Sequence, residues 1–552
     1  MFARKSWLRV STTYLVLAFA ALALSAQQSG ETSQEEAPET FGGTVNVQVV
    51  NVDVHVTDRH GKIVTGLKKS DFELFEDGRP VKITNFYAEN GRAERPARQL
   101  RVEAPPASGQ AKNPAPETAE GETANLPDRQ RLWVVFFIDN LSLRPPDRTR
   151  VLRQLHEFVD QAIGPGDHAM VVAFDRSMKV LQPFTSDRYS VLQAFDKAER
   201  LSAEGVHAEE NRNEVLKALH DAKDPADAIG RVDSYSGSLF NDVDTTIRAL
   251  TDFIHSLSGL EGRKALVYVS DGLPQRAGLD AYYALRDKFR QATSLQGPSR
   301  YDSTHSLDEL AAAANTARVV FYTLDAGGLR VRTDATAEQF LPTAGDTVDS
   351  DYISNRQSSL QLLARQTGGQ AVINTNDVRA PMRKVKSDLS TFYSLGFTPV
   401  HEGDGRYHRI TVKVKKRGLR LRYRQGYRDQ PEATRMIDAT LAALKFGETT
   451  NPLKAGLSVG EVKPDGQGDY VASIILRVPL DQITAIPLRD GSRQVQLRLF
   501  VVLRSPDGTT PVHQVPVKLR ITAEEWKAVQ SRSITYPLKL TVSPGGQLLT
   551  VG

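Results

Sequence analysis

Cysteine is absent from all 552 residues of the sequence. This excludes disulfide frameworks, thiolate zinc sites, iron–sulfur clusters and cysteine nucleophiles, so any bound metal would be held by oxygen or imidazole. A strong charge of one sign is also absent, because 70 basic residues oppose 66 acidic ones and leave a net charge of +4. Nucleic-acid binding is therefore not indicated. There is no phosphate-binding loop, dinucleotide fingerprint or Gly-x-Ser-x-Gly elbow, so the sequence predicts no enzyme and no catalytic residue.

The composition that remains is that of a folded protein. Hydrophobic residues make up 40% of the chain and charged residues 25%, which is ordinary for globular domains. At roughly 150 residues per domain, the length predicts three or four domains.

The first residues resemble a secretory leader. The basic residues Arg4, Lys5 and Arg9 precede an apolar run, Tyr14–Leu24, which small residues follow. This pattern predicts a cleavable signal peptide over residues 1–26. A membrane anchor is the alternative, but the run is much shorter than the roughly 20 residues that a spanning helix needs. We therefore expect an exported protein, located in the periplasm, at the cell surface or outside the cell, with no membrane span after cleavage.

Composition shifts divide the rest of the chain. Residues 44–90 alternate as β-strands do, which predicts an N-terminal β unit. Residues 91–130 are rich in proline and poor in large apolar side chains, as in a flexible linker. Residues 391–430 are predicted to form a basic antiparallel β-hairpin. Alternation and two Pro-Asp-Gly turns over residues 437–552 predict a C-terminal β-sandwich.

Residues 131–390 have a different pattern, in which short apolar runs are separated by amphipathic helical stretches. This is typical of an α/β doubly wound domain with a mostly parallel sheet. The polar insertions 202–233 and 330–355 are predicted to lie outside the sheet. The five predicted strands are Leu132–Ile138, Ala169–Phe174, Ala265–Val269, Val319–Leu324 and Ala371–Ile373.

Four of these strands run into an aspartate at their carboxyl ends, where open parallel sheets bind their ligands. Such carboxylates are hard oxygen ligands suited to Mg²⁺, Mn²⁺ or Ca²⁺. The alternative is that they cap helices or close turns, which is common. The four residues are Asp139, Asp175, Asp271 and Asp325.

Several motifs resemble a known family. The runs Leu132-Trp-Val-Val-Phe-Phe-Ile-Asp139 and Lys264-Ala-Leu-Val-Tyr-Val-Ser-Asp-Gly272 resemble a von Willebrand factor type A domain. The flanking motifs Val64-Thr-Gly-Leu-Lys-Lys-Ser-Asp-Phe-Glu-Leu-Phe-Glu-Asp77 and Phe392-Tyr-Ser-Leu-Gly-Phe-Thr-Pro399 are similar to the VWFA-related acidobacterial domain family, which consists of secreted bacterial proteins. The resemblance covers roughly residues 44–428 and is uninformative about the ligand.

The resemblance implies a metal-ion-dependent adhesion site built from Asp-x-Ser-x-Ser, a threonine from a later loop and a second aspartate. Asp139 and Asp271 match the two aspartates. Leu141 and Leu143 occupy the two serine positions, and Ser142 falls between them.

The threonine is also missing; Tyr235–Phe240 is expected to form the corresponding loop, with Ser236 or Ser238 as a substitute hydroxyl. The candidate metal ligands are therefore Asp139, Ser142, Ser236, Ser238 and Asp271, forming a degenerate site for Mg²⁺ or Mn²⁺. The alternative is a site without metal, in which backbone amides or neighbouring basic groups satisfy the aspartates.

These observations favour a secreted protein-interaction or adhesion module without catalytic activity. An acidic side chain of the protein partner would complete the metal sphere. The alternatives are an envelope assembly scaffold that binds protein without metal, and a metal-assisted hydrolase with His168 or His305 as the base. The basic hairpin is a further candidate surface, for an anionic glycan, although charged side chains also protect ordinary sheet edges.

Overall fold

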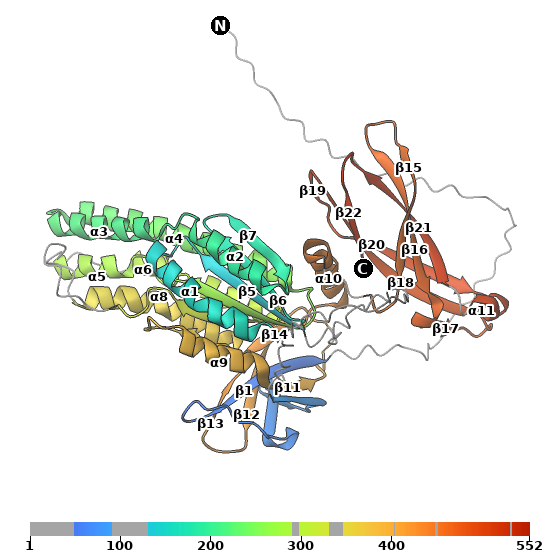
Figure 1. Ribbon diagram of the computed structural model, residues 1–552, viewed down its shortest axis with the longest axis horizontal. Coiled ribbons are helices and arrows are strands. Elements are labelled where there is room, and N and C mark those ends of the chain that lie inside the picture. Colours follow the sequence, from blue (N-terminus) through green and yellow to red (C-terminus); the bar gives the residue numbers. More distant parts are fainter. Residues whose placement is uncertain are drawn as a thin grey trace, which may run out of the picture. The chain divides into compact units, whose positions relative to one another are not determined.

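The computed structural model describes residues 49–90, 131–164, 166–289, 297–330, 346–401, 403–447, 451–529 and 533–552 (Figure 1). The predicted signal peptide 1–26 and linker 91–130 lie outside these ranges. Within them, no helix is both long enough and apolar enough to cross a membrane.

A six-stranded sheet forms the centre of the predicted α/β domain. Its strand order is β10-β9-β8-β5-β6-β7, and all neighbours are parallel except β6 and β7. The chain starts in the middle with β5 and builds outward on both sides, so the topological switch point lies between β5 and β8. The strands are β5 (Leu132–Asp139), β6 (His168–Phe174), β7 (Met178–Thr185), β8 (Arg263–Ser270), β9 (Val319–Asp325) and β10 (Ala371–Val372).

Two apolar cores lie on opposite faces of this sheet because successive strand residues point to opposite sides. Along β5, Val134 and Phe136 belong to one core, whereas Val135 and Phe137 belong to the other. The first core is completed by helices α1 (Pro145–Ala162), α2 (Arg188–Glu199) and α9 (Arg379–Ser390). The second is completed by α4 (Pro225–Leu257), α7 (Thr304–Thr316) and α8 (Asp346–Thr367).

The predicted insertion 202–233 is helical. It forms α3 (Gly205–Asp221) and the first turns of α4, which run beside α5 (Leu279–Lys288) and α8 beyond the end of the sheet (Figure 1). A small core with Leu216, Val232 and Tyr282 joins these helices. The short helix α6 (Gly297–Arg300) follows α5. Of the second insertion, residues 331–345 lie outside the described ranges.

The predicted N-terminal β unit and basic hairpin form one structure, which we call the β module (residues 49–90 and 391–429). It has two four-stranded sheets, in the orders β13-β1-β11-β4 and β14-β12-β2-β3, around a shared core. A 3₁₀ turn, η1 (Lys69–Asp71), precedes β2. The strands are β1 (Val50–Asp58), β2 (Phe72–Glu76), β3 (Arg79–Val81), β4 (Asn85–Asn90), β11 (Thr391–Phe397), β12 (Tyr407–Val414), β13 (Leu419–Arg422) and β14 (Gly426–Arg428).

The hairpin prediction for residues 391–430 is therefore wrong in its pairing. Strand β12 pairs with β2 and β14, whereas β13 pairs with β1 in the other sheet. Two of the basic residues are also engaged inside the protein. Arg422 Nη2 donates to both carboxylate oxygens of Asp388, at 2.8 and 2.9 Å, and Arg424 donates hydrogen bonds to the carbonyl oxygens of Asn315 and Asn51. These two arginines are not free to bind a glycan.

The C-terminal region contains helix α10 (Glu432–Phe446) and two antiparallel sheets. Their apolar faces share one core, to which β16 and β18 contribute most of the buried residues. The elements are β15 (Gly456–Pro464), β16 (Tyr470–Pro479), η3 (Leu480–Gln482), β17 (Ile486–Pro487), β18 (Arg493–Ser505), β19 (Gly508–Thr509), β20 (His513–Ile521), α11 (Ala523–Val529), β21 (Ser533–Val542) and β22 (Leu548–Val551).

Candidate functional site

Three of the four predicted aspartates lie at the carboxyl ends of the neighbouring strands β5, β8 and β9, which we call the rim. Asp139 ends β5, Asp271 follows β8 directly, and Asp325 ends β9. Asp139 and Asp325 are buried, while the side chain of Asp271 is 14% exposed. The fourth, Asp175, pairs with Lys179 next to β6.

Asp139 accepts hydrogen bonds through only one of its carboxylate oxygens. Its Oδ2 atom accepts from the hydroxyls of Ser142, Tyr268 and Ser270, each at 2.8 Å. Its Oδ1 atom is buried and has no partner among the described residues. Burial raises the pKa of Asp139, although the three hydroxyl groups oppose this shift.

The turn after β5 explains the altered serine positions. The amides of Ser142 and Leu143 both donate to the carbonyl oxygen of Asp139, at 3.1 and 3.2 Å. This tight turn buries Leu141 and Leu143 in the two cores and directs Ser142 to the rim. There, Ser142 Oγ lies 2.9 Å from Ser270 Oγ and accepts the backbone N–H of Asp271 at 3.1 Å. The structure thus brings Asp139, Ser142 and Asp271 together at the rim.

Two arginines that the sequence analysis did not single out contact Asp271. Arg330 donates a hydrogen bond to Asp271 Oδ1 and also lies 3.8 Å from Asp325 Oδ1. Arg356, in α8, donates to the backbone oxygen of Asp271 at 3.0 Å and lies 3.8 Å from its Oδ2. Positive charge from two guanidinium groups is therefore already placed at this carboxylate.

Glycines make room for these arginines. A Cβ atom on Gly327 would lie 2.3 Å from Arg330 Nη2 and 2.5 Å from Asp271 Oδ1. Gly272 has φ of 84°, and a Cβ there would lie 2.5 Å from the carbonyl oxygen of Arg356. The Gly327-Gly328 pair after β9 is a sequence signal that could have indicated such a close approach of side chains to the backbone.

The segment with Ser236 and Ser238 is not a loop, contrary to the prediction. Both residues lie within α4, which continues unbroken from Pro225 to Leu257. Ser236 is fully buried against Gly278, which begins the next helix, and Ser238 is exposed. The expected loop is therefore a helix, and no hydrogen bond among the described residues joins Ser236 or Ser238 to Asp139 or Asp271.

The residues at the rim do not fit the divalent cation that the resemblance implies. Such an ion needs about six oxygen ligands, but the two serine positions hold buried leucines and the expected loop is a helix. Asp271 is paired with Arg330 and approached by Arg356. Two candidate ligand atoms, Asp139 Oδ1 and Ser236 Oγ, are buried without a hydrogen-bond partner among the described residues, but burial favours the protonated form of Asp139.

Of the two histidines of the hydrolase alternative, His168 lies away from the rim. His168 begins β6, so roughly 20 Å of strand separates it from the rim. His305 is 86% exposed and pairs with Glu309 at 3.3 Å.

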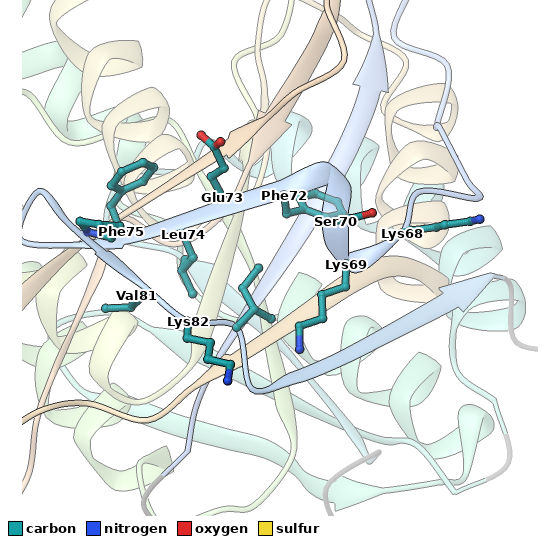
Figure 2. A pocket seen from close by; sticks show the side chains of 11 residues that line it. Lys68, Lys69, Ser70, Phe72, Glu73, Leu74, Phe75, Val81 and Lys82 are labelled. Atoms are coloured by element: carbon teal, nitrogen blue, oxygen red, sulfur yellow. The ribbon is translucent and has the colours of Figure 1, made fainter.

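A separate groove of about 710 Å³ lies on the β module, beside β2 and β3 (Figure 2). Its lining includes Phe72, Leu74 and Val81. Lys69 and Lys82 point to the same side of the groove, and Glu73 points to the other. The sequence analysis did not single out this surface.

No family model matches the chain, and no curated protein matches it. Solved structures do show similarity. Proximal thread matrix protein 1 from the mussel byssus is 13% identical over 47% of this chain and 48% of its own, with a TM-score of 0.22. The match thus spans about half of that protein, one structure of which has a zinc-occupied MIDAS motif.

Two bacterial structures match more of their own length. An aerotolerance-related membrane protein from Bacteroides fragilis is 10% identical over 47% of this chain and 98% of its own, with a TM-score of 0.21. The vWF domain of the type V pili tip protein Mfa5 from Porphyromonas gingivalis is 12% identical over 47% and 95%, with a TM-score of 0.23.

Similarities of this size carry no argument about function or site. The doubly wound sheet itself, with a rim at the carboxyl ends of β5, β8 and β9, is the α/β doubly wound domain that the sequence pattern predicts.

Proposed function

We propose that this chain is an exported protein-interaction module whose rim binds an acidic side chain of a protein partner directly through Arg330, without a divalent cation. The observation that carries the proposal is the position of Arg330, which contacts Asp271 where the resemblance implies a metal. The flanking motifs and the leader support membership in the secreted VWFA-related family. In this proposal the module binds its partner and catalyses no reaction.

Arg330 has the accessibility that a binding residue needs. Its side chain is 21% exposed, whereas its Nε atom is buried and has no hydrogen-bond partner among the described residues, so a partner would meet the exposed edge of the guanidinium. A guanidinium presents five N–H donors in a fixed plane, so it can donate to Asp271 and to a second carboxylate at the same time. Arg356 is buried behind it and adds positive charge without being available to the partner.

The competing proposal uses the same rim with Mg²⁺ or Mn²⁺ held by Asp139, Ser142, Asp271 and a serine of α4, Ser236 or Ser238. It requires Arg330 to leave Asp271. Calorimetric titration of either ion into the chelator-treated chain separates the two proposals. We expect no saturable heat at the rim, whereas saturable binding that Asp139→Ala abolishes would favour the metal.

A peptide selection tests the proposed function itself. Random displayed peptides are selected on the full chain in chelator and, in parallel, in Mg²⁺. We expect both selections to enrich peptides with Asp or Glu, and Arg330→Gln to weaken their binding about tenfold or more, as for the loss of a charge-assisted hydrogen bond. Arg379→Gln, an exposed arginine paired with Asp377 on α9, is the matched control.

Three results would overturn the proposal. The first is enrichment that requires Mg²⁺, and the second is enrichment without acidic residues. The third is equal binding of the selected peptides to Arg330→Gln and to the unchanged chain.

A further inference from the structure

The groove on the β module lies where one of its two sheets ends early. Strand β3 pairs with β2 only over the stretch from Leu74 to Glu76, after which the chain leaves this sheet and starts β4 in the other one. Phe72 and Glu73, at the start of β2, therefore have no partner in β3. The groove follows this gap and is lined by η1, by β2 and by the segment that joins β3 to β4 (Figure 2). It is thus a product of the short β3 and is formed before any partner binds.

The floor of the groove is apolar and belongs to the core of the β module. Phe72, Leu74 and Ile83 line the groove, are at most 7% exposed, and are members of that core. Val81 also lines the groove and packs against the same core. Because these side chains are already packed, the groove needs no rearrangement to receive an apolar group. Its volume of about 710 Å³ is within the range of sites that bury a ligand.

The free edge of β3 is unsuited to binding a partner by strand pairing. β3 is the outermost strand of its sheet, and Pro80 is the central one of its three residues. Proline donates no backbone hydrogen bond, and a proline on a short edge strand prevents pairing with a further strand. Recognition at this surface therefore depends on the side chains that line the groove and not on a backbone ladder.

Two lysines give one side of the groove a positive charge. Lys69 and Lys82 are exposed and point to the same side (Figure 2). Lys69 donates to the carbonyl oxygen of Thr84 at 3.5 Å, and neither lysine forms an ion pair with a carboxylate of the described residues. Asp71, close to Lys69 in the sequence, is paired with Lys416 at 3.6 Å. This side of the groove therefore attracts a negative group of a binding partner.

The other side of the groove carries the opposite charge. Glu73 is exposed and points away from the two lysines (Figure 2). It lies opposite Lys413 where β2 pairs with β12, but Lys413 Nζ lies over the ring of Phe75, 4.7 Å from its centre. A ligand that is negative along its whole length would be attracted by one side of the groove and repelled by the other. A peptide can present an acidic side chain to the lysines and a neutral or basic one to Glu73.

We propose that the groove is a protein-binding surface separate from the rim, and that its ligand is an extended segment of a partner protein in which apolar side chains adjoin Asp or Glu. The apolar side chains fill the groove, and the acidic ones lie against Lys69 and Lys82. Burial of apolar area supplies most of the affinity, whereas two exposed ion pairs contribute less and select the acidic sequence. The groove belongs to the β module and the rim to the α/β domain, so a substitution at one leaves the other intact.

A fluorescent label in the groove reports binding directly. The chain has no cysteine, so Ser70→Cys, in the lining of the groove, introduces a single thiol for an environment-sensitive fluorophore. Random displayed peptides are selected on the unchanged full chain and then titrated into the labelled chain. We expect enriched peptides with an acidic residue next to apolar residues to shift the fluorescence of the label at position 70. A label on Ser234→Cys, an exposed position in α4, should not respond.

Charge variants test the contact with the lysines. For peptides that shift the label, Lys69→Gln combined with Lys82→Gln should weaken binding about three- to tenfold, as for the loss of two exposed ion pairs. Lys223→Gln combined with Lys384→Gln, at two other exposed lysines, is the matched control and should change nothing. Arg330→Gln should also leave these affinities unchanged, so a failure at the groove is distinguishable from a failure at the rim.

The proposal is wrong if no enriched peptide shifts the label at position 70, or if the peptides that shift it lack acidic residues. Equal affinity of those peptides for the unchanged chain and for the combined Lys69→Gln and Lys82→Gln variant would also overturn it. So would displacement of the bound peptides by phosphatidylglycerol vesicles or by heparin, because the groove would then accept a uniformly negative ligand.

Discussion

Replacing Asp139 by Asn and by Ala separates two roles of this residue, as an acceptor of hydrogen bonds and as a charged metal ligand. Asn keeps an oxygen that accepts from Ser142, Tyr268 and Ser270, and it replaces the unpartnered Oδ1 by an amide nitrogen. The unpaired amide nitrogen carries a cost, which is offset to the extent that Asp139 is ionised, because Asn then removes a buried negative charge. In the absence of a metal, we therefore expect Asp139→Asn to stay within about 1 kcal/mol of the unchanged protein.

Ala removes the acceptor entirely. Ser142 and Ser270 retain each other at 2.9 Å, but the fully buried Tyr268 hydroxyl loses its acceptor. An unpaired buried hydroxyl costs about 1–3 kcal/mol, and with the emptied space the total loss is about 2–4 kcal/mol. The comparison between Asn and Ala thus isolates the hydrogen bonds from the charge.

Urea denaturation followed through Trp133, which is buried on β5, measures these differences. A Trp526→Phe background removes the signal of α11. Burial raises the pKa of Asp139 above 3.8, so the folded state binds this proton more tightly and the stability contributed by Asp139 falls as pH rises past that value. Asn should abolish this slope. If Asn is as damaging as Ala, or damaging only in Mg²⁺ or Mn²⁺, the charge itself is required and the metal-free interpretation is refuted.

Two further predictions concern buried bases. Lys264 is 3% exposed and donates a hydrogen bond to the carbonyl oxygen of Ala317 at 3.0 Å. Burial, with repulsion from Arg318 and Arg424, lowers the pKa of Lys264 to about 7. Replacing Lys264 by Met should therefore stabilise the protein by about 1–3 kcal/mol below pH 7 and by less at higher pH, and an unchanged urea midpoint would contradict this. Burial lowers the pKa of His55 from 6.5 to about 4, so the unfolded state binds this proton first, and about 3 kcal/mol of stability should disappear as pH falls from 6.5 to 4. Urea midpoints across that interval should fall less steeply for His55→Leu, and equal slopes would refute the assignment.

The sequence predicted the central sheet well because its parallel strands are buried on both faces and read as apolar runs. All five predicted strands appear as β5, β6, β8, β9 and β10. Strand β7, which was not predicted, forms the antiparallel edge of the sheet. It carries Lys179, Gln182 and Pro183, which interrupt the apolar pattern. Edge strands need less apolar surface, so this signal was weak.

Pairing within the β module was not predictable from local patterns. Val50 pairs with Phe397, and the alternation of each segment says nothing about a partner so far along the chain. For the same reason, the contact between His401 and Glu76 could not be predicted, because these residues lie far apart in the sequence.

At the rim, local sequence was informative only for residues attached to strand ends. Asp139, Ser142 and Asp271 meet because β5 and β8 are neighbours. Arg330 and Arg356 reach Asp271 from an insertion and from a helix, through long side chains whose direction no periodicity encodes. The loop that was expected at Ser236 is not formed, because α4 continues through this position and no proline or turn motif there interrupts the helix.

The composition of the β module has a consequence for the order of folding. Its two sheets are assembled from strands that precede and follow the whole α/β domain, so β1 and β2 are synthesised long before β11 and β12. Until then they carry unpaired hydrogen-bonding edges, which invite pairing with other chains. A fragment that begins at Arg131 would leave β11 and β12 in the reverse situation, without their neighbours. A cut at either end of the described α/β domain is therefore compatible with folding only if both halves of the β module are kept together or removed together.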